Sequence, residues 1–214
     1  MEKEQLNASS EVPLELELQR LRKRGPYAKT ASRQRKILEA AAQVYAEYGY
    51  YGSSLREIAA KAGMSLSTLT HHFASKEEIL MATLEQRDAD GVSLHSVRTA
   101  ADFRRQVLNQ AKANEKSSAL IGLYSVLSAE STTPDHPARS YFIDRFSVVR
   151  RDYSRVLELL RDRDELRPGL DPRLTAISLV ALWDGLQLQW LLEPKTVDVV
   201  AQLSIFLDLI LVSD

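Results

Sequence analysis

Short polar side chains are concentrated in residues 65–71, within a segment that has the apolar spacing of a helix. The polar residues are Ser65, Ser67, Thr68, Thr70 and His71. Leu66, Leu69 and Phe73 recur at helical spacing and supply a face that would pack inward. Hydroxyl and imidazole groups donate and accept hydrogen bonds, and because these side chains are short they let a helix approach base edges and phosphates. The segment therefore has the chemistry of a nucleic-acid contact.

Two short helices joined by a glycine-containing turn would position these side chains. Ser54 is placed to cap the first helix, and Glu57 stands at the reciprocal capping-box position. Gly63 follows the first helix, where a left-handed residue commonly ends a helix, and Ser65 is placed to cap the second. This spacing predicts a helix-turn-helix, whose second helix lies in the major groove while the first crosses the DNA backbone.

With its surroundings, this unit resembles the TetR family of one-component transcriptional regulators over roughly residues 30–80. The matching segments are ILEAA at 37–41, YGY at 48–50, LREIA at 55–59, AGMS at 62–65, STLTHHF at 67–73 and SKEEI at 75–79. One departure is Thr70, which stands where the family usually has a tyrosine that contacts a phosphate, and whose reach is shorter. A second segment, ALWDGLQLQW at 181–190, is similar to the C-terminal domains of the BetI-type and actinobacterial branch.

The resemblance implies a homodimeric, ligand-responsive regulator, foremost a repressor, that binds a pseudo-palindromic double-stranded DNA operator and is released by a small-molecule effector. By resemblance, Arg56 in the crossing helix and Thr68, Thr70 and His71 in the recognition helix are placed for bases or adjacent phosphates. Lys76 opens the next helix, where its ammonium and the backbone donors of the helix N-terminus would share a phosphate. In the family, movement of that helix couples ligand binding to release of DNA.

Residues 1–29 are expected to form a flexible arm. Eight basic residues follow one another without an acidic residue between them, and Gly25-Pro26 is expected to break any helix there. They are Arg20, Arg22, Lys23, Arg24, Lys29, Arg33, Arg35 and Lys36. A basic run is by itself most often a solvated arm, but directly before a helix-turn-helix it favours phosphate or minor-groove contact. Arg24 and Lys29 are therefore candidate DNA contacts.

The composition favours an all-α protein. The chain has 214 residues, 44% of them hydrophobic, a formal net charge of −1 and no cysteine, which excludes disulfides and thiol chemistry. No apolar run reaches the roughly 18 residues that a membrane span needs, so the expected location is the cytoplasm. We expect a helix-turn-helix domain at 30–76 and a larger helical ligand-binding and dimerisation domain at 77–214.

The C-terminal half is expected to be a bundle of helices. Apolar spacing and capping signals predict helices at about 76–90, with a stop at Gly91, and at 102–114, 117–130, 138–163, 173–192 and from Thr196 onward. The last two helices carry more apolar residues than one buried face can use. This excess predicts a two-fold dimer interface built from these two helices.

An effector pocket inside this bundle would be largely apolar, with few polar groups. The candidates are Phe103, Tyr124, Tyr141, Phe142, Phe146, Trp183, Asp184, Gln187 and Trp190. Aromatic residues at helical spacing are more often ordinary core. Asp184 is expected to be buried within an apolar helix, where it would need an arginine, a cationic ligand or a dimer-interface partner, and the sequence leaves these alternatives open.

No catalytic, cofactor or metal site is expected. His71 and His72 are neighbours on a helix and point about 100° apart, so they do not chelate one metal. The chain has no glycine-rich phosphate loop and no nucleophile elbow. The alternative to a DNA-binding regulator is a helical protein-interaction scaffold, which predicts no salt-dependent DNA affinity.

Overall fold

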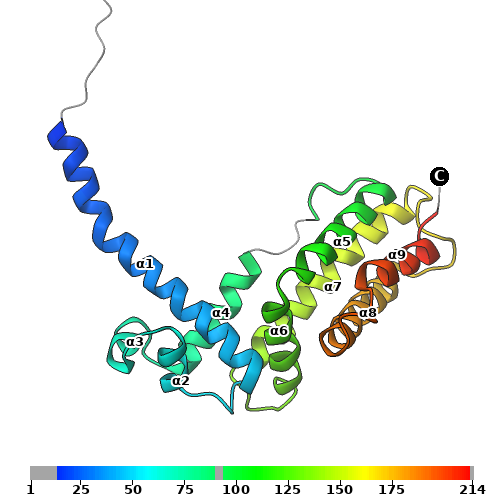
Figure 1. Ribbon diagram of the computed structural model, residues 1–214. Coiled ribbons are helices and arrows are strands. Elements are labelled where there is room, and N and C mark those ends of the chain that lie inside the picture. The colour runs from blue at the N-terminus through cyan, green and yellow to red at the C-terminus, as the bar shows by residue number, and fades with distance from the viewer. Residues whose placement is uncertain (1–13, 90–93, 213–214) are drawn as a thin grey trace, which may run out of the picture.

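The helices of the C-terminal half lie beside a three-helix unit that is built on one long helix (Figure 1). The computed structural model describes residues 14–89 and 94–212, and it describes side chains for 30–86 and 94–212. Within these ranges the secondary structure is helical, and the only extended pairing is one isolated bridge between Leu166 and Leu211. The helices are α1 (Leu14–Tyr48), α2 (Leu55–Lys61), α3 (Leu66–His72), α4 (Lys76–Ala89), α5 (Ala100–Glu115), α6 (Ser118–Glu130), α7 (Arg139–Arg161), α8 (Pro172–Leu192) and α9 (Val199–Ile210). The predicted all-α fold is confirmed.

Helix α1 differs from its prediction. It is continuous from Leu14 to Tyr48, so the expected start near Thr30 and the break at Gly25-Pro26 were wrong. Proline lacks the backbone N–H that a helix interior uses, and glycine is a weak helix former. Leucine, glutamate, arginine and lysine on both sides favour the helix, so it continues through Gly25-Pro26 without the hydrogen bond that proline cannot donate. The use of residues 1–29 as a DNA-binding arm stays a prediction, since residues 1–13 and the side chains of Arg24 and Lys29 lie outside the described residues.

The N-terminal unit has a core that continues into the C-terminal half. Ile37 and Tyr45 of α1 pack with the buried Ile58 of α2 and Leu69 of α3. The same cluster takes in residues of α4, α6 and α7, namely Ile79, Leu80, Leu84, Leu123, Leu127, Ala138 and Phe142. Because one continuous apolar cluster spans both halves, displacement of α4 or α6 is mechanically linked to α1 and the two short helices.

A second core holds the C-terminal bundle together. Phe103 of α5, Leu157 of α7, Leu179 of α8 and Leu207 of α9 are completely buried in it. The chain end is tied to the connection between α7 and α8, because Arg167 N–H donates to the Ile210 carbonyl at 2.8 Å. None of the helices in the described ranges combines the length and the apolar character that crossing a bilayer requires.

Local capping signals predicted most helix starts. Ser54, Ser65, Ser75 and Asp171 each accept the backbone N–H three residues ahead, and Pro172 occupies the first position of α8 as expected. Helix α9 instead begins at Val199, later than predicted, because the Asp198 carboxylate caps it by accepting the Ala201 N–H. The predicted end of α4 at Gly91 lies outside the described residues.

Candidate nucleic-acid interface

Helix α3 presents a polar outer face from a firmly anchored inner face. Leu69 is completely buried and Phe73 nearly so, which fixes the rotation of the helix about its own axis. Ser67, Thr70 and His71 are exposed on the opposite side. These three side chains are therefore accessible to a partner outside the protein, and their contact with DNA stays a prediction.

The hydroxyl groups of α3 are pre-oriented by hydrogen bonds within the helix. Ser65 Oγ accepts the Thr68 N–H at 3.1 Å and lies 2.9 Å from Thr68 Oγ1. Thr70 Oγ1 donates to the Ser67 carbonyl at 3.2 Å. A hydroxyl that donates keeps lone pairs to accept from a base amino group, and it can exchange its weak local bond for one to a phosphate. Ser65 is exposed and Thr68 is half-buried, so the cap lies at the rim of the polar face.

Helix α2 supplies the second part of this surface. Ile58 and Ala59 are buried against α1, and Arg56 is exposed on the opposite side. The capping box is only half formed as predicted: Ser54 Oγ accepts the Glu57 N–H, and its own proton goes to the Glu57 carboxylate at 2.7 Å. Arg56 therefore extends from a helix whose first turn is fixed.

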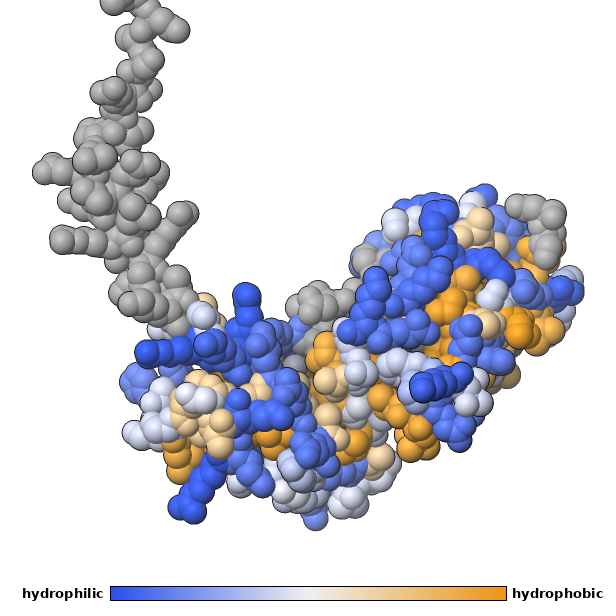
Figure 2. Space-filling model, in the orientation of Figure 1, coloured by the Kyte–Doolittle hydropathy of each residue, from blue (hydrophilic) through white to orange (hydrophobic). Residues whose placement is uncertain are grey.

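Exposed basic residues of α1 continue the surface. Arg33, Arg35 and Lys36 are all exposed in the part of α1 nearest the arm. Figure 2 shows hydrophilic surface over this part of the molecule, next to the residues drawn in grey. A basic run that leads into the helix-turn-helix suits the phosphate backbone, whose neutralisation is independent of base sequence.

Lys76 occupies a different place from the one predicted. Its ammonium donates to the carbonyls of Tyr50 at 2.7 Å and Ser53 at 2.8 Å, and it lies 4.2 Å from the centre of the Tyr50 ring. Burial lowers the pKa of Lys76, and the carboxylates of Glu130 and Glu57 oppose this shift. The side chain is thus engaged inside the protein, where it holds the loop between α1 and α2 against the start of α4. We assign Lys76 to this internal contact.

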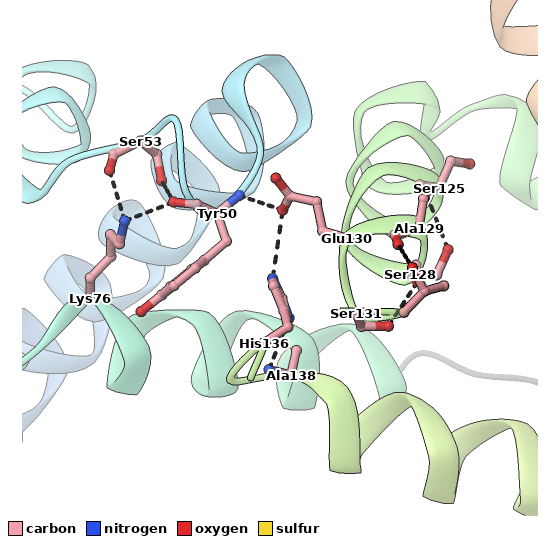
Figure 3. A network of polar contacts seen from close by, with 11 residues as sticks. Tyr50, Ser53, Lys76, Ser125, Ser128, Ala129, Glu130, Ser131, His136 and Ala138 are labelled. Carbon is pink, nitrogen blue, oxygen red and sulfur yellow. Dashed lines mark hydrogen bonds and ion pairs between the residues drawn. The ribbon is translucent and has the colours of Figure 1, made fainter. Parts of the chain in front are cut away.

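The loop at 49–53 is also held from the C-terminal half, by residues that the sequence did not indicate (Figure 3). Glu130, the last residue of α6, accepts the Tyr50 N–H through Oε2 at 2.7 Å. His136 packs edge-on against the rings of Tyr50 and Tyr51, each 5.4 Å away. No local pattern around Glu130 or His136 identifies partners about 80 residues away. The feature that marks this contact as unusual is the burial of His136, which is 3% exposed and is seen only in the structure.

The predicted effector residues separate into two groups. Tyr124, Tyr141, Phe142 and Phe146 lie together between α6 and α7, in the core shared with the N-terminal unit. Phe103 and Trp183 belong to the other core, where the Trp183 indole N–H is buried and has no hydrogen-bond partner within the described residues. The candidate residues therefore lie in two separate clusters, and their role in binding an effector stays a prediction.

The effector candidates in the second half of α8 differ in how far they are exposed. Asp184 is exposed in the single chain, and Gln187 and Trp190 are half-buried. Of the partners left open for Asp184, a dimer-interface partner stays a prediction. An apolar stretch on all sides of a helix does not reveal which side faces the chain's own core. Asp184 still acts on the buried Tyr153: burial raises the pKa of the Tyr153 phenol, Arg145 lowers it and Asp184 raises it.

The first aromatic group contacts α4 directly. The hydroxyl groups of Tyr124 and Tyr141 lie 2.5 Å apart, and the Tyr141 hydroxyl donates to the Leu84 carbonyl of α4 at 3.5 Å. The Arg145 guanidinium lies 5.3 Å from the centre of the Tyr124 ring. A ligand that displaced these hydroxyl groups would act on α4, the helix that follows the helix-turn-helix.

A surface hollow of about 410 Å³ lies elsewhere, between the start of α5 and the chain end. Its charged side chains already have partners: Arg104 pairs with Asp208 at 2.5 Å, and Glu165 with Arg163 at 2.8 Å. None of the predicted effector residues lines it. The hollow therefore gives no support to the predicted effector site.

The anchored α2–turn–α3 unit, its exposed polar face and the helical bundle behind it define a helix-turn-helix DNA-binding regulator. The model for bacterial regulatory proteins of the tetR family matches residues 37–83, and the model for the C-terminal part of BetI-type transcriptional repressors matches 127–212. The chain belongs to the TetR family of transcriptional regulators.

Individual relatives agree with this assignment. The A-factor receptor protein of Streptomyces griseus is 31% identical over 160 residues, which are 72% of this chain but only 53% of that protein. The transcriptional regulator PksA of Bacillus subtilis is 27% identical over 78% of this chain and 82% of its own length. A transcriptional regulator of Saccharomonospora viridis, solved in complex with choline, shares the fold with a TM-score of 0.68 at 22% identity, over 86% of this chain and all of that one.

Proposed function

We propose that this protein is a homodimeric repressor that acts in the cytoplasm, binds a pseudo-palindromic DNA operator through α2 and α3, and releases it on binding a small-molecule effector. The observation that carries the proposal is the orientation of α3. Buried Leu69 and Phe73 hold the helix so that Ser67, Thr70 and His71 face outward together. A scaffold protein has no need of this arrangement, whereas a recognition helix depends on it.

The proposed contacts fall into two classes. Ser67, Thr68 and His71 specify sequence, because they are on the helix that would enter the major groove. Thr70, on the same helix, contacts an adjacent phosphate. Arg56 and Ser65 hold the backbone beside the groove, and Arg24 and Lys29 of the arm neutralise phosphates without specifying bases. Thr70 is shorter than tyrosine, so its phosphate contact requires close approach of the helix backbone.

The proposed dimer forms through α8 and α9. Both helices expose large apolar side chains that the single chain leaves in water, with Leu192 76% and Leu209 64% exposed. The set comprises Leu174, Ile177, Leu188 and Leu192 of α8 and Ile205 and Leu209 of α9. Figure 2 shows apolar surface over this part of the molecule. Two copies related by a two-fold axis would bury this face and match the symmetry of a palindromic operator.

The proposed effector site is the aromatic group formed by Tyr124, Tyr141, Phe142 and Phe146. These rings combine an apolar surface with two hydroxyl groups, and one hydroxyl already bonds to the α4 backbone. An effector with an apolar body and a hydrogen-bonding group would compete for that bond and displace α4.

The test is selection of duplexes from a random pool by the full-length protein, followed by fluorescence anisotropy on the recovered sequence across a salt series. We expect competitor-resistant binding and a slope of log affinity against log salt of about −0.9 for each phosphate neutralised. His71→Ala should change the selected sequence, whereas Glu39→Ala, at an exposed position of α1, should not. Recovery of no common sequence, together with a flat salt slope, would favour the scaffold alternative.

A further inference from the structure

The loop between α1 and α2 bonds through its backbone to the end of α6 in the C-terminal half. The Tyr50 N–H donates to Glu130 Oε2 at 2.7 Å. The loop then runs through Ser53, which is buried, to Ser54, which caps α2. A displacement at the end of α6 therefore reaches the first helix of the DNA-binding unit within four residues.

Gly49 is shaped for this contact in two ways. Its φ of 69° lies in the left-handed region, which glycine adopts without steric cost. A Cβ atom at Gly49 would also lie 2.8 Å from Glu130 Cδ and closer still to Oε1, so the carboxylate occupies the space that a side chain would fill. Gly63 has a similar φ of 66°, but a Cβ atom there would meet nothing within 4 Å. The positive φ alone therefore does not imply a close neighbour, and at Gly49 that neighbour is the Glu130 carboxylate.

The contact is reinforced on both sides of the loop. Lys76 bonds to the carbonyls of Tyr50 and Ser53 from the start of α4. His136 Nδ1 accepts the Ala138 N–H, which leaves the imidazole proton on Nε2, the atom that lies 3.6 Å from Glu130 Oε2. The Glu130 carboxylate thus contacts the loop, lies close to His136 and interacts electrostatically with the Lys76 ammonium (Figure 3).

The carboxylate has an electrostatically unfavourable position with respect to helix ends. The carboxylate lies at the C-terminus of α1, beside Gly49, and it belongs to Glu130, which is the last residue of α6. Helix C-termini carry partial negative charge and disfavour a carboxylate. A residue whose position opposes two helix dipoles is poorly explained by the stability of its own helix. Its bond to the other half of the chain supplies an alternative reason for its presence.

We infer that Glu130 is a positioning residue for DNA binding: its carboxylate holds the Tyr50 N–H over Gly49 and thereby fixes α2 and α3 relative to the C-terminal half. The inference rests on the proposed function. Besides the connection through α4, the Glu130 contact gives a second connection, through the end of α6, by which a change in the C-terminal half reaches the DNA-binding surface. Glu130 has no contact with DNA in this mechanism and acts only through the loop.

The experiment compares Glu130→Ala, Glu130→Gln and the control Glu115→Ala, which removes an exposed carboxylate at the end of α5. Hydrogen exchange of the full-length protein reports on residues 47–62, and anisotropy reports on the duplex that the wild-type protein selects. We expect Glu130→Ala to accelerate exchange in 47–62 and to weaken binding to that duplex about tenfold. Binding to scrambled duplex, which depends on phosphate contacts, should stay unchanged.

Glu130→Gln should recover most of the affinity, because its amide oxygen can accept the same N–H, and Glu115→Ala should resemble the wild type in both measurements. A purely structural role would lower the urea midpoint of Glu130→Ala without changing affinity under conditions where the protein is folded. If Glu130→Ala exchanges hydrogen in residues 47–62 at the wild-type rate, or binds the selected duplex with wild-type affinity, the inference is overturned and the proposed function is unaffected. A wild-type protein that selects no sequence would instead overturn the proposed function and the inference with it.

Discussion

Replacing Gly49 by alanine should destabilise the protein through two separable effects. The first is backbone strain, because a left-handed conformation costs about 1–2 kcal/mol in a residue with a Cβ atom. The second is expulsion of the Glu130 carboxylate from the space that the new Cβ atom takes, with loss of its bond to the Tyr50 N–H. Bonds to charged groups contribute about 1.5–3 kcal/mol, and we take the lower end because Glu130 is 26% exposed. We therefore expect Gly49→Ala to cost about 3 kcal/mol in all.

A double-mutant cycle separates the two effects. In a Glu130→Ala background the bond is already lost and the space is empty, so Gly49→Ala should cost only the strain, about 1–2 kcal/mol. The two substitutions should thus be less destabilising together than the sum of the single variants, by about 1.5 kcal/mol. The measurement is urea unfolding followed by circular dichroism, at one fixed protein concentration because dimerisation contributes to stability.

Gly63 supplies the matched control for this cycle. Gly63→Ala introduces similar strain, at a φ of 66°, but meets no neighbouring atom, so it should combine with Glu130→Ala additively within about 0.5 kcal/mol. Additivity of Gly49→Ala with Glu130→Ala to the same precision would refute the reasoning, because it would show that the carboxylate does not depend on the missing Cβ atom.

Three further predictions concern pH, dimerisation and DNA. Burial holds the pKa of His136 below its ordinary value of 6.5, so the unfolded chain binds the proton more readily. Thermal stability should therefore fall as pH decreases through 6.5 and level off below the pKa of His136 in the folded protein. His136→Gln should reduce this fall, whereas the control His95→Gln, at an exposed position, should not. Equal falls in both variants would contradict the assignment. Leu188→Glu should place an unpaired charge in the proposed dimer face and weaken association by about 3 kcal/mol, measured by analytical ultracentrifugation. Ala60→Glu, an exposed position of α2, is its control, and an unchanged dimer in Leu188→Glu would exclude this face. Lys36→Gln should weaken binding to all duplexes alike and reduce the salt slope by about one, and weakening confined to the selected sequence would indicate a base contact instead.

Features encoded by near neighbours were predictable from the sequence. Ser54, Ser65 and Asp171 cap helices as their spacing indicated, because a cap depends on residues only three positions apart. The anchored face of α3 followed from the spacing of Leu69 and Phe73 in the same way. The helix-turn-helix is therefore predictable as a unit, and its outward polar side chains with it.

Where the structure of the single chain differs from the expectation, a tertiary contact or an uncovered helix face is the reason. Lys76 was expected at a phosphate because it opens a helix. In the single chain its ammonium donates hydrogen bonds to carbonyls 23 and 26 residues earlier. Asp184 was expected to be buried because α8 is apolar all round. It is exposed because one apolar side of that helix faces away from the chain's own core, as the 52% exposure of Leu188 shows. Periodicity indicates how much apolar surface a helix has, and it does not say what covers it.

The contact between Glu130 and the loop shows why a coupling element escapes sequence analysis. Glu130 is the last residue of α6, and Gly49 directly follows α1. Gly49 has a sufficient local explanation as a helix stop, and no neighbouring residue of Glu130 indicates what its carboxylate contacts. The relation between the two positions becomes visible only in the fold, which brings the Tyr50 N–H, next to Gly49, to 2.7 Å from the Glu130 carboxylate 80 residues away. A regulator must connect two surfaces through its interior, so the residues that do this are joined by packing and not by spacing. In this chain the outward polar face of α3 was predictable from the sequence, whereas the residues proposed to position it became apparent only in the fold.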